Sequence, residues 1–374
     1  MAEKNLDFDT VIDRTHTNSL KYDFAVQRGK PKDVLPLWVA DMDFQVSSYI
    51  QEALSGSVAH GIFGYSEAEG SYFEAVAGWM SRHYGWNVEE TWLVKTPGIV
   101  FALAQAVRAF TEPGDAVLLQ QPVYYPFSQV IRDNGRKIVD NTLVQGEDGR
   151  YRIDFTDFEE KIRSCKVKLF FLCNPHNPVG RVWTKEELLR LGDICERYGV
   201  IVVSDEIHAD FVFEGSHQVL AGLEESYRKF VVTCTAPSKT FNLAGLQVSN
   251  IFIPDDALRR KFEQAVGASG YSQLNTMGLV ACEAAYRHGE EWYEAVKAYI
   301  RENLAYAQHF LEEQIPQVKA VEPEGTYLLW VDFRSLGLSR RELEDLIVKK
   351  AGLWLDSGDI FGAAGRGFER INVA

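Results

Sequence analysis

The sequence has few cysteines and a shortage of basic residues relative to acidic ones. Five cysteines stand among 374 residues, an odd number with no Cys-x-x-Cys pair, and several lie in apolar runs. This pattern argues against a disulfide framework and favours free thiols in a reducing compartment, so we expect a cytoplasmic protein. Basic residues number 39 against 53 acidic ones, a net charge of −14. Such a balance argues against nucleic acid or an anionic membrane as the main partner.

Long hydrophobic runs, internal repeats and low-complexity segments are also missing. No apolar run reaches the length of a membrane span, and residues 1–7 lack the apolar stretch of a signal peptide. Hydrophobic residues still make up 46% of the chain, which is enough for a sizeable core. The length suits one large domain with a smaller lobe.

Short apolar runs alternate with helical patterns from Trp92 onward. Continuous apolar strands between helices are typical of a mostly parallel sheet that is covered on both faces. We therefore predict an α/β fold with a large domain over residues 46–289. The predicted strands of this domain are 92–94, 116–119, 168–173, 200–204, 230–234 and 248–253.

The pattern changes after Pro254. One helical stretch is predicted over 257–289 and a long amphipathic helix over 290–314, before further strands and a helix that begins at Ser339. We expect a small α+β domain over residues 290–374, joined by an N-terminal arm of residues 1–45. Because the chain stops inside a predicted strand, we also expect this domain to lack a closing helix and to be truncated.

Lys239 follows the predicted strand 230–234, in a stretch of small, apolar and hydroxylated residues. Partial desolvation in such a place lowers the pKa of a lysine and makes its amine a nucleophile that can form a Schiff base. Taken alone, the stretch favours a surface lysine after a strand, because short motif matches often occur by chance.

Four other loops follow predicted strands, at the edge where parallel sheets bind ligands. Gly98 opens a helix whose N–H groups can hold a phosphate, or it is a plain helix cap. Tyr124 can stack on a planar ring or pack within its loop. Asn177 lies in a stiff loop with two prolines, and Asp205 follows four apolar residues and Ser204 and needs a cationic partner. Together with a lysine, these groups meet the needs of pyridoxal 5′-phosphate.

Several motifs in combination carry a resemblance to a known family. The chain resembles the fold-type I pyridoxal-phosphate enzymes, the aspartate-aminotransferase superfamily, and within it the MalY/PatB-like branch of cystathionine β-lyases and cysteine-S-conjugate β-lyases. The resemblance implies a seven-stranded-type sheet with helices on both faces. The matching stretches are Leu37–Phe44, Gly64-Tyr65, Pro122–Tyr124, Asn174–Gly180, Asp205–His208, Ala236–Asn242 and Phe368–Val373.

The resemblance also implies roles for single residues around the cofactor. Lys239 would bind the aldehyde, Asp205 would pair with the pyridine nitrogen, Asn177 would bond the ring oxygen and Tyr124 would stack on the ring. The phosphate would be held by Gly98, Ile99, Val100 and Ser238, and by Tyr65 of a neighbouring subunit, which implies a homodimer. The substrate carboxylate would be bound by Arg370 and by the backbone of Ala40.

Three positions depart from the superfamily pattern. Gln247 stands where many members have an arginine on the phosphate, and Ala236 stands where a serine is common. His208 replaces a tyrosine, and it is a candidate for that residue's hydrogen bond to the ring oxygen. These departures predict weaker neutralisation of the phosphate.

The function implied by the resemblance is β-elimination of a sulfur amino acid, giving a thiol, pyruvate and ammonia. Lys239 would remove the Cα proton, and either Lys239 or Tyr124 would protonate the leaving sulfur. An aminotransferase is the first alternative, because it uses the same lysine. A non-catalytic regulator that binds the cofactor is the second, although the acidic chain carries no DNA-binding module. No residue pattern in the sequence predicts a metal site.

Overall fold

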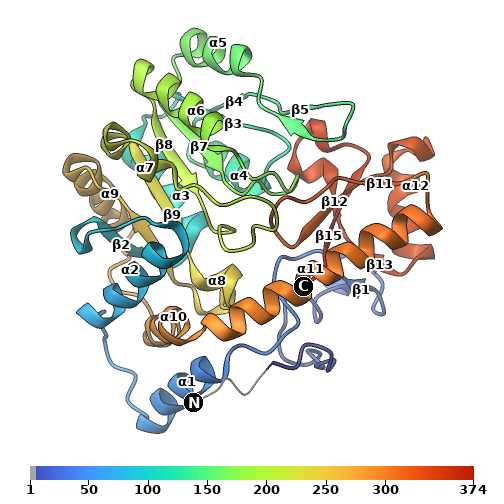
Figure 1. The fold of residues 1–374 in the computed structure, drawn as a ribbon, viewed down its shortest axis with the longest axis horizontal. Helices are drawn as coiled ribbons and strands as arrows, with labels where there is room; N and C mark the ends of the chain where they lie inside the picture. The colour runs from blue at the N-terminus through green and yellow to red at the C-terminus, as the bar shows by residue number, and fades with distance from the viewer. Residues whose placement is uncertain (1–5) are drawn as a thin grey trace.

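The computed structural model describes residues 6–374 and contains two main sheets (Figure 1). The larger sheet has seven strands, and all of its neighbouring pairs are parallel except the two that β10 makes. The predicted α/β fold with a mostly parallel seven-stranded sheet is therefore confirmed. In spatial order the strands are β2 (Leu93–Thr96), β10 (Ser249–Phe252), β9 (Val231–Thr235), β8 (Ile201–Asp205), β7 (Leu169–Cys173), β3 (Ala116–Leu119) and β4 (Lys137–Asp140).

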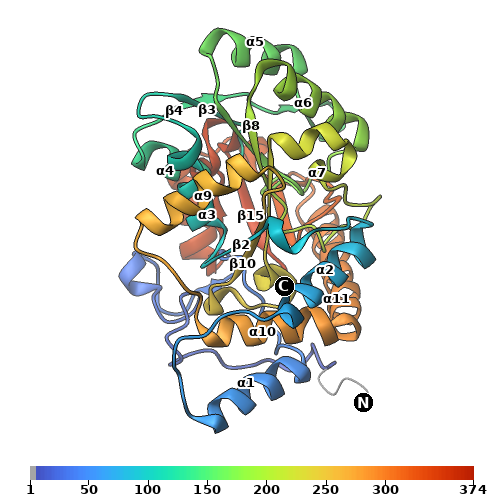
Figure 2. The same ribbon diagram turned by 90° about the vertical axis from the view of Figure 1, so that its left-hand side faces the viewer.

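Helices cover both faces of this sheet because its strands are apolar on both sides. Along β7, Phe170 and Leu172 pack into one core cluster, while Leu169 and Phe171 pack into the other. Figure 2 shows α3, α4 and α9 on one side of the sheet and α6 and α7 on the other. The covering helices are α2 (Gly70–Tyr84), α3 (Ile99–Phe110), α4 (Tyr125–Asp133), α5 (Phe155–Cys165), α6 (Lys185–Tyr198), α7 (Leu220–Leu223), α9 (Asp256–Ala268) and α10 (Thr276–His288).

A four-stranded antiparallel sheet forms the second layer, beside the C-terminal part of the long helix α11 (Glu290–Gln314). The N-terminal region contributes β1 (Leu35–Pro36), which pairs in parallel with β13 (Leu353–Trp354) as a separate two-stranded sheet. A capping box at Ser339 starts α12 (Arg340–Glu344), which continues as a π-helical turn, Asp345–Lys350. The strands are β11 (Lys319–Ala320), β12 (Leu328–Asp332), β15 (Phe368–Asn372) and β14 (Asp356–Ser357).

The prediction of one helical stretch over 257–289 is wrong in its middle. α9 ends at Ala268, and Gly270 then adopts a left-handed conformation with φ of 79°. Asn275 starts α10 anew, because its side-chain oxygen accepts a hydrogen bond from the N–H of Gly278 at 2.7 Å. The intervening loop faces the start of α3 instead of lengthening the helix, through the contact between Tyr271 and Phe101.

The structure also contains two short hairpin strands, β5 (Val144–Gln145) and β6 (Tyr151–Arg152), and two further helices, α1 (Ser48–His60) and the one-turn α8 (Pro237–Thr240). Within residues 6–374, no helix has both the length and the apolar character needed to cross a membrane. All five cysteines are free thiols, and only Cys165 is exposed.

Candidate active site

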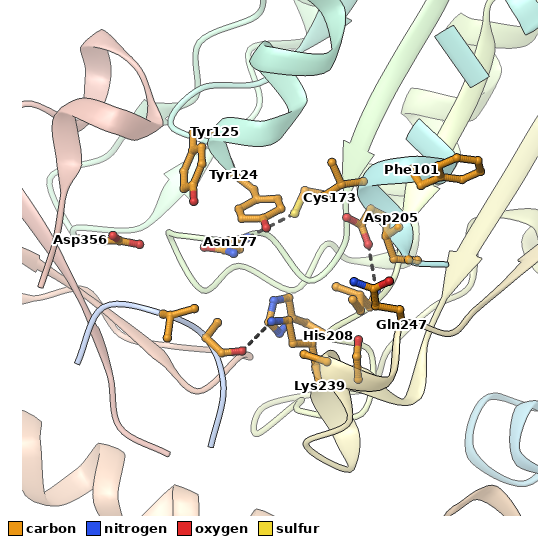
Figure 3. Close-up of a pocket in the computed structure, with 18 of the residues that line it drawn as sticks. Phe101, Tyr124, Tyr125, Cys173, Asn177, Asp205, His208, Lys239, Gln247 and Asp356 are labelled. Atoms are coloured by element: carbon orange, nitrogen blue, oxygen red, sulfur yellow. Dashed lines mark hydrogen bonds between the residues drawn. The ribbon is translucent and has the colours of Figure 1, made fainter. Parts of the chain in front are cut away.

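A cavity of 330 Å³ lies where β7, β8, β9 and the start of α3 meet β14 and β15 of the second sheet. It opens at the carboxyl ends of the parallel strands, the edge at which such sheets bind ligands. Eleven of the residues predicted from the sequence line it, and Figure 3 shows several of them turned toward one another. The eleven are Ala40, Gly98, Ile99, Val100, Tyr124, Asn177, Asp205, His208, Ser238, Lys239 and Arg370.

Lys239 enters the cavity from α8. The proline at the first position of this one-turn helix fits a fixed backbone angle at a helix start and turns the chain sharply after β9. The Nζ of Lys239 donates a hydrogen bond to the carbonyl oxygen of Ala40 at 2.6 Å. Burial, with the nearby Arg370 adding to it, lowers the pKa of Lys239 to about 8. A larger share of this amine is therefore unprotonated near neutral pH than in an exposed lysine.

The segment 38–44, which carries Ala40, is held by side chains from distant parts of the chain. Asn242 accepts a hydrogen bond from the N–H of Met42 at 3.0 Å and donates to its carbonyl at 2.9 Å. Asn372 donates to the carbonyls of Val39 and Asp41 at 2.8 and 2.7 Å. These amide pairs fix the backbone of the segment opposite Lys239.

Ion pairs anchor the same segment from its outer side. Arg14 binds Asp41 at 2.9 Å and Asp43 at 2.6 Å, and the fully buried Lys21 binds Asp43 at 2.8 Å. Tyr22 donates to Asp43 at 2.9 Å. The N-terminal region therefore supports one wall of the cavity.

Asp205 ends β8 as a buried carboxyl. It accepts the backbone N–H of Ile207 at 3.2 Å. Burial raises the pKa of Asp205 to about 7, and the nearby Lys239 opposes the rise. A carboxylate placed this way is stabilised by any cation that enters the cavity.

His208 lies three residues further on and is also buried. Burial, with Lys239 and Arg370 nearby, lowers the pKa of His208 well below its usual range, so the ring is neutral. Its Nδ1 has no hydrogen-bond partner among the described residues. A buried, unpartnered ring nitrogen at the cavity wall is a group that a polar ligand can satisfy.

The first turn of α3 supplies backbone donors. Gly98, with φ of 134°, caps the helix, and its carbonyl accepts the N–H of Ala102 at 3.1 Å. The N–H of Gly98 is donated to Ser249 Oγ at 3.1 Å. The N–H groups of Ile99 and Val100 precede the first intrahelical hydrogen bond, and they are the donors that an anion would meet at this helix start.

Tyr124 and Asn177 lie in two neighbouring loops that form part of the cavity wall. The backbone N–H of Tyr124 donates to the carbonyl of Asn177 at 3.0 Å, which holds the two loops together. The side-chain oxygen of Asn177 accepts Nη1 of Arg370 at 3.0 Å. Because the oxygen is occupied by a cation, the amide nitrogen is the part of this side chain that can donate to a ligand.

Arg370 is buried in β15 and is divided among three acceptors. Besides Asn177, it donates through Nη2 to the carbonyl of Trp38 at 2.7 Å and to the carboxylate of Asp356 in a short ion pair. Burial raises the pKa of Asp356, while Arg370 opposes the rise. A carboxylate partner for this arginine was not among the residues expected from the sequence.

Tyr65 is the one predicted residue that does not line the cavity. It is 97% exposed and borders a second cavity, which it shares with Gln247. Gln247 also lines the main cavity, so it lies between the two spaces. Tyr65 is therefore near the site's outer rim but does not reach into it within one subunit.

Sequence reasoning missed several residues that shape the cavity. Trp38 and Tyr125 line it, Ser249 binds Gly98, and the hydroxyl of Tyr327 donates to the carbonyl of Ala40 at 3.2 Å. Asp356, which was also missed, had a readable signal, because it is an acid that directly follows the apolar run Leu353-Trp354-Leu355, as Asp205 follows its own strand.

A seven-stranded α/β sheet that meets a smaller antiparallel sheet at a cavity lined by a lysine and an arginine is the architecture of an aminotransferase-fold protein. Residues 32–374 match the family described as aminotransferase class I and II, and the chain belongs to that family.

Individual relatives narrow this placement. The chain is 45% identical over 369 residues to cystathionine β-lyase PatB of Bacillus subtilis, covering 98% of this chain and 95% of that protein. It is 32% identical to protein MalY of Escherichia coli, covering 98% and 94%. Its structure is similar to that of cystalysin from Treponema denticola, which contains pyridoxal 5′-phosphate. That likeness has a TM-score of 0.95 and 38% identity, and it covers 98% of this chain and 94% of that one.

Proposed function

We propose that the protein uses pyridoxal 5′-phosphate to catalyse β-elimination of a thioether amino acid, releasing a thiol, pyruvate and ammonia. The observation that carries this proposal is the 45% identity to an enzyme named cystathionine β-lyase across 98% of the chain. The cavity supports it, because a lysine with a pKa of about 8 and a buried arginine face the same space. It is thus an enzyme of the carbon–sulfur lyase type.

The residues of the cavity fit this cofactor. The buried Asp205 suits a protonated pyridine nitrogen, and the unpartnered Nδ1 of His208 and the amide nitrogen of Asn177 suit ring oxygen. Donors for the phosphate are Ile99, Val100 and Ser238. When bound, the cofactor supplies an electron sink that stabilises negative charge at the substrate Cα.

The protein's own groups then have separate tasks. Arg370 binds the substrate carboxylate, with the backbone of Ala40 beside it. Lys239 removes the Cα proton as the free amine and returns a proton to the sulfur when the Cβ–S bond breaks. Tyr124 would stack on the cofactor ring. The 2-aminoacrylate that leaves the site hydrolyses to pyruvate and ammonia.

A pyruvate assay separates this reaction from its alternatives. Purified protein with L-cystathionine should release pyruvate and a thiol without any added keto acid. Strict dependence on an added keto acid would instead establish an aminotransferase, which is the activity in the description of the family. No reaction with either mixture, in protein that carries the cofactor, would favour a non-catalytic regulator.

The lysine is tested by spectroscopy and activity together. We expect wild-type protein to show a visible absorption band from the bound cofactor, and we expect Lys239→Ala to lose the band of the lysine-linked form and at least about 10³-fold in kcat/KM. Wild-type protein incubated with the cofactor that shows no such band would contradict the proposal. Lys229→Ala, a variant of a lysine outside the cavity, serves as the control.

The remaining organisation is proposed on similar grounds. We infer a homodimer in which Tyr65 of each subunit reaches the phosphate site of the other, supported by the exposure of Tyr65 beside Gln247. We divide the chain into an arm (1–45), a large cofactor-binding domain (46–289) and a small domain (290–374). The five free thiols support a cytoplasmic location.

A further inference from the structure

Asp356 places a carboxylate at one end of the cavity. Its strand β14 pairs with β15 so that Asp356 lies directly opposite Arg370. The side chain of Asp356 is 10% exposed and lines the cavity beside Tyr125. Figure 3 shows these two residues on the side of the cavity away from Asp205 and Phe101. The carboxylate therefore lies beside the proposed substrate-binding arginine and away from the proposed phosphate site.

The hydrogen bonds of Arg370 leave no free edge for a second carboxylate. A bidentate carboxylate needs two N–H groups on one edge of the guanidinium, and each such edge includes one of the two hydrogens on Nη2. Nη2 already donates to the carbonyl of Trp38 and to Asp356. The carbonyl is part of the fixed backbone. A substrate carboxylate that binds Arg370 bidentately therefore shares or takes the place of Asp356.

Displacement leaves Asp356 as a buried carboxylate that has lost its cation. Such a group is costly unless another positive charge replaces the lost one. The neighbouring Glu369 does not compete for that charge at neutral pH, because burial raises the pKa of Glu369 to about 8. Trp38, Val39 and Tyr125 otherwise form this part of the wall. Asp356 is thus the negative charge that a substrate tail meets there.

We propose that Asp356 determines specificity by selecting thioether amino acids whose side chain carries an ammonium group and by disfavouring those with an anionic tail. The inference rests on the proposed function, since it names the substrate class of the same site. The α-carboxylate of the substrate forms an ion pair with Arg370, and its distal ammonium forms an ion pair with Asp356. These two pairs replace the ion pair between Arg370 and Asp356. A substrate with a neutral tail can pair with Arg370 but leaves Asp356 without a cationic partner.

The test uses three thioethers of similar size and different charge. They are S-(2-aminoethyl)-L-cysteine, S-propyl-L-cysteine and S-carboxymethyl-L-cysteine, with pyruvate release measured for wild type and Asp356→Asn. The ratio of kcat/KM between the two proteins is taken for each compound, because this ratio cancels the chemistry of the leaving thiol. We expect the substitution to lower kcat/KM for the cationic compound about ten-fold relative to the neutral one and to raise it for the anionic compound.

Equal changes for all three compounds would overturn the proposal, because they would mean that Asp356 only positions Arg370. The matched control is Asp359→Asn, which removes an aspartate outside the cavity that pairs with Arg340 and Arg366. We expect this variant to leave the three ratios near one.

A binding measurement keeps the inference separate from the proposed function. If wild-type protein releases no pyruvate from L-cystathionine or from any of the three compounds, the lyase proposal fails, but the three compounds can still be titrated against the absorption band of the holoenzyme. Tightest binding of the aminoethyl compound and weakest binding of the carboxymethyl compound supports the role of Asp356. The reverse order, or equal affinities, overturns it. This titration needs no variant, so it also serves if Asp356→Asn does not fold.

Discussion

At the residue scale, the two side chains proposed as proton donors to the leaving sulfur, Lys239 and Tyr124, differ in acidity. Burial lowers the pKa of Lys239 to about 8, whereas burial raises the pKa of Tyr124 far above its usual range. Proton transfer is most efficient when the pKa of the donor lies near the working pH. Lys239 is therefore the better proton donor for the leaving sulfur, a choice that the sequence left open.

Replacing Tyr124 by phenylalanine tests this assignment. Tyr124→Phe keeps an aromatic ring at the stacking position and removes only the hydroxyl. We expect kcat for a thioether substrate to fall by less than about ten-fold, since general acid catalysis by the hydroxyl would be worth about 10²–10⁴-fold. A larger loss, with unchanged cofactor absorbance, would move the proton-donor role to Tyr124.

The acidity of Lys239 also predicts how cofactor binding depends on pH. Only the unprotonated amine attacks the aldehyde, and the usual lysine pKa of 10.5 is lowered here to about 8. The rate at which the visible band appears after the apoprotein is mixed with the cofactor should rise about ten-fold per pH unit below pH 8 and level off above it. Stopped-flow absorbance measures this. A rate that keeps rising up to pH 10 would show that the amine is not perturbed.

At the scale of single elements, strand β15 carries a buried acid, Glu369, next to Arg370 in the sequence. Burial, with Asp356 nearby, raises the pKa of Glu369 from its usual 4.5 to about 8. Between these values the folded protein holds a proton that the unfolded chain has released. The stability that this proton confers is complete below about pH 4.5 and is lost as the pH rises through 8.

The substitution Glu369→Gln should remove this loss of folding stability at rising pH. The free energy of unfolding of the variant relative to wild type should grow by about 4 kcal/mol between pH 5 and pH 9. Urea denaturation at several pH values measures the difference. Glu312→Gln, at an exposed position on α11, is the control and should show no such trend. A constant difference would mean that Glu369 ionises normally in the folded protein.

The elements that could be predicted from sequence are those with a strong local signal. Apolar runs predicted the strands of the large sheet, and Ser339 marked a helix start whose capping box the structure contains. The break at Gly270 was missed, because helical residues on both sides of it masked one glycine. The role of Asn242 was also missed, since it depends on a left-handed backbone with φ of 57° and on a segment 200 residues away.

Part of the site could also be predicted, because some of its residues carry a strong local signal in the sequence. Lys239, Asp205 and Asn177 each follow a strand, and parallel strands bring their ends together without further information. The partners of Arg370 were not predictable, because the pairing of β14 with β15 and the position of Trp38 depend on tertiary packing.

At the scale of the whole molecule, the rim of the cavity exposes apolar side chains. Ile62 is 71% exposed, Phe63 62% and Tyr65 97%, and the second cavity runs from Phe63 and Tyr65 to Gln247. Exposed apolar groups beside a ligand site are typical of a surface that another subunit covers. This supports the proposed homodimer, in which each site is completed by its partner.

Hybrid dimers test the sharing of Tyr65. Tyr65→Ala and Lys239→Ala proteins should each be weakly active, but after mixing, unfolding and refolding together, half of the dimers combine one subunit of each kind. Such a hybrid has one site with both residues intact, so activity should recover to about a quarter of wild type. Absence of recovery, with dimers verified by light scattering, would mean that Tyr65 serves its own subunit or none.

The segment 38–44 links the order of synthesis to the time at which the site can form. Its backbone is fixed by Asn242 and by Asn372, and its Ala40 carbonyl meets Lys239. While the chain is being made, the large sheet can assemble as soon as β10 has left the ribosome, but one wall of the cavity waits for residue 372. Cofactor capture is therefore a late event on the nascent chain, and ribosome-bound chains that stop before β15 should fold their large sheet without retaining the cofactor.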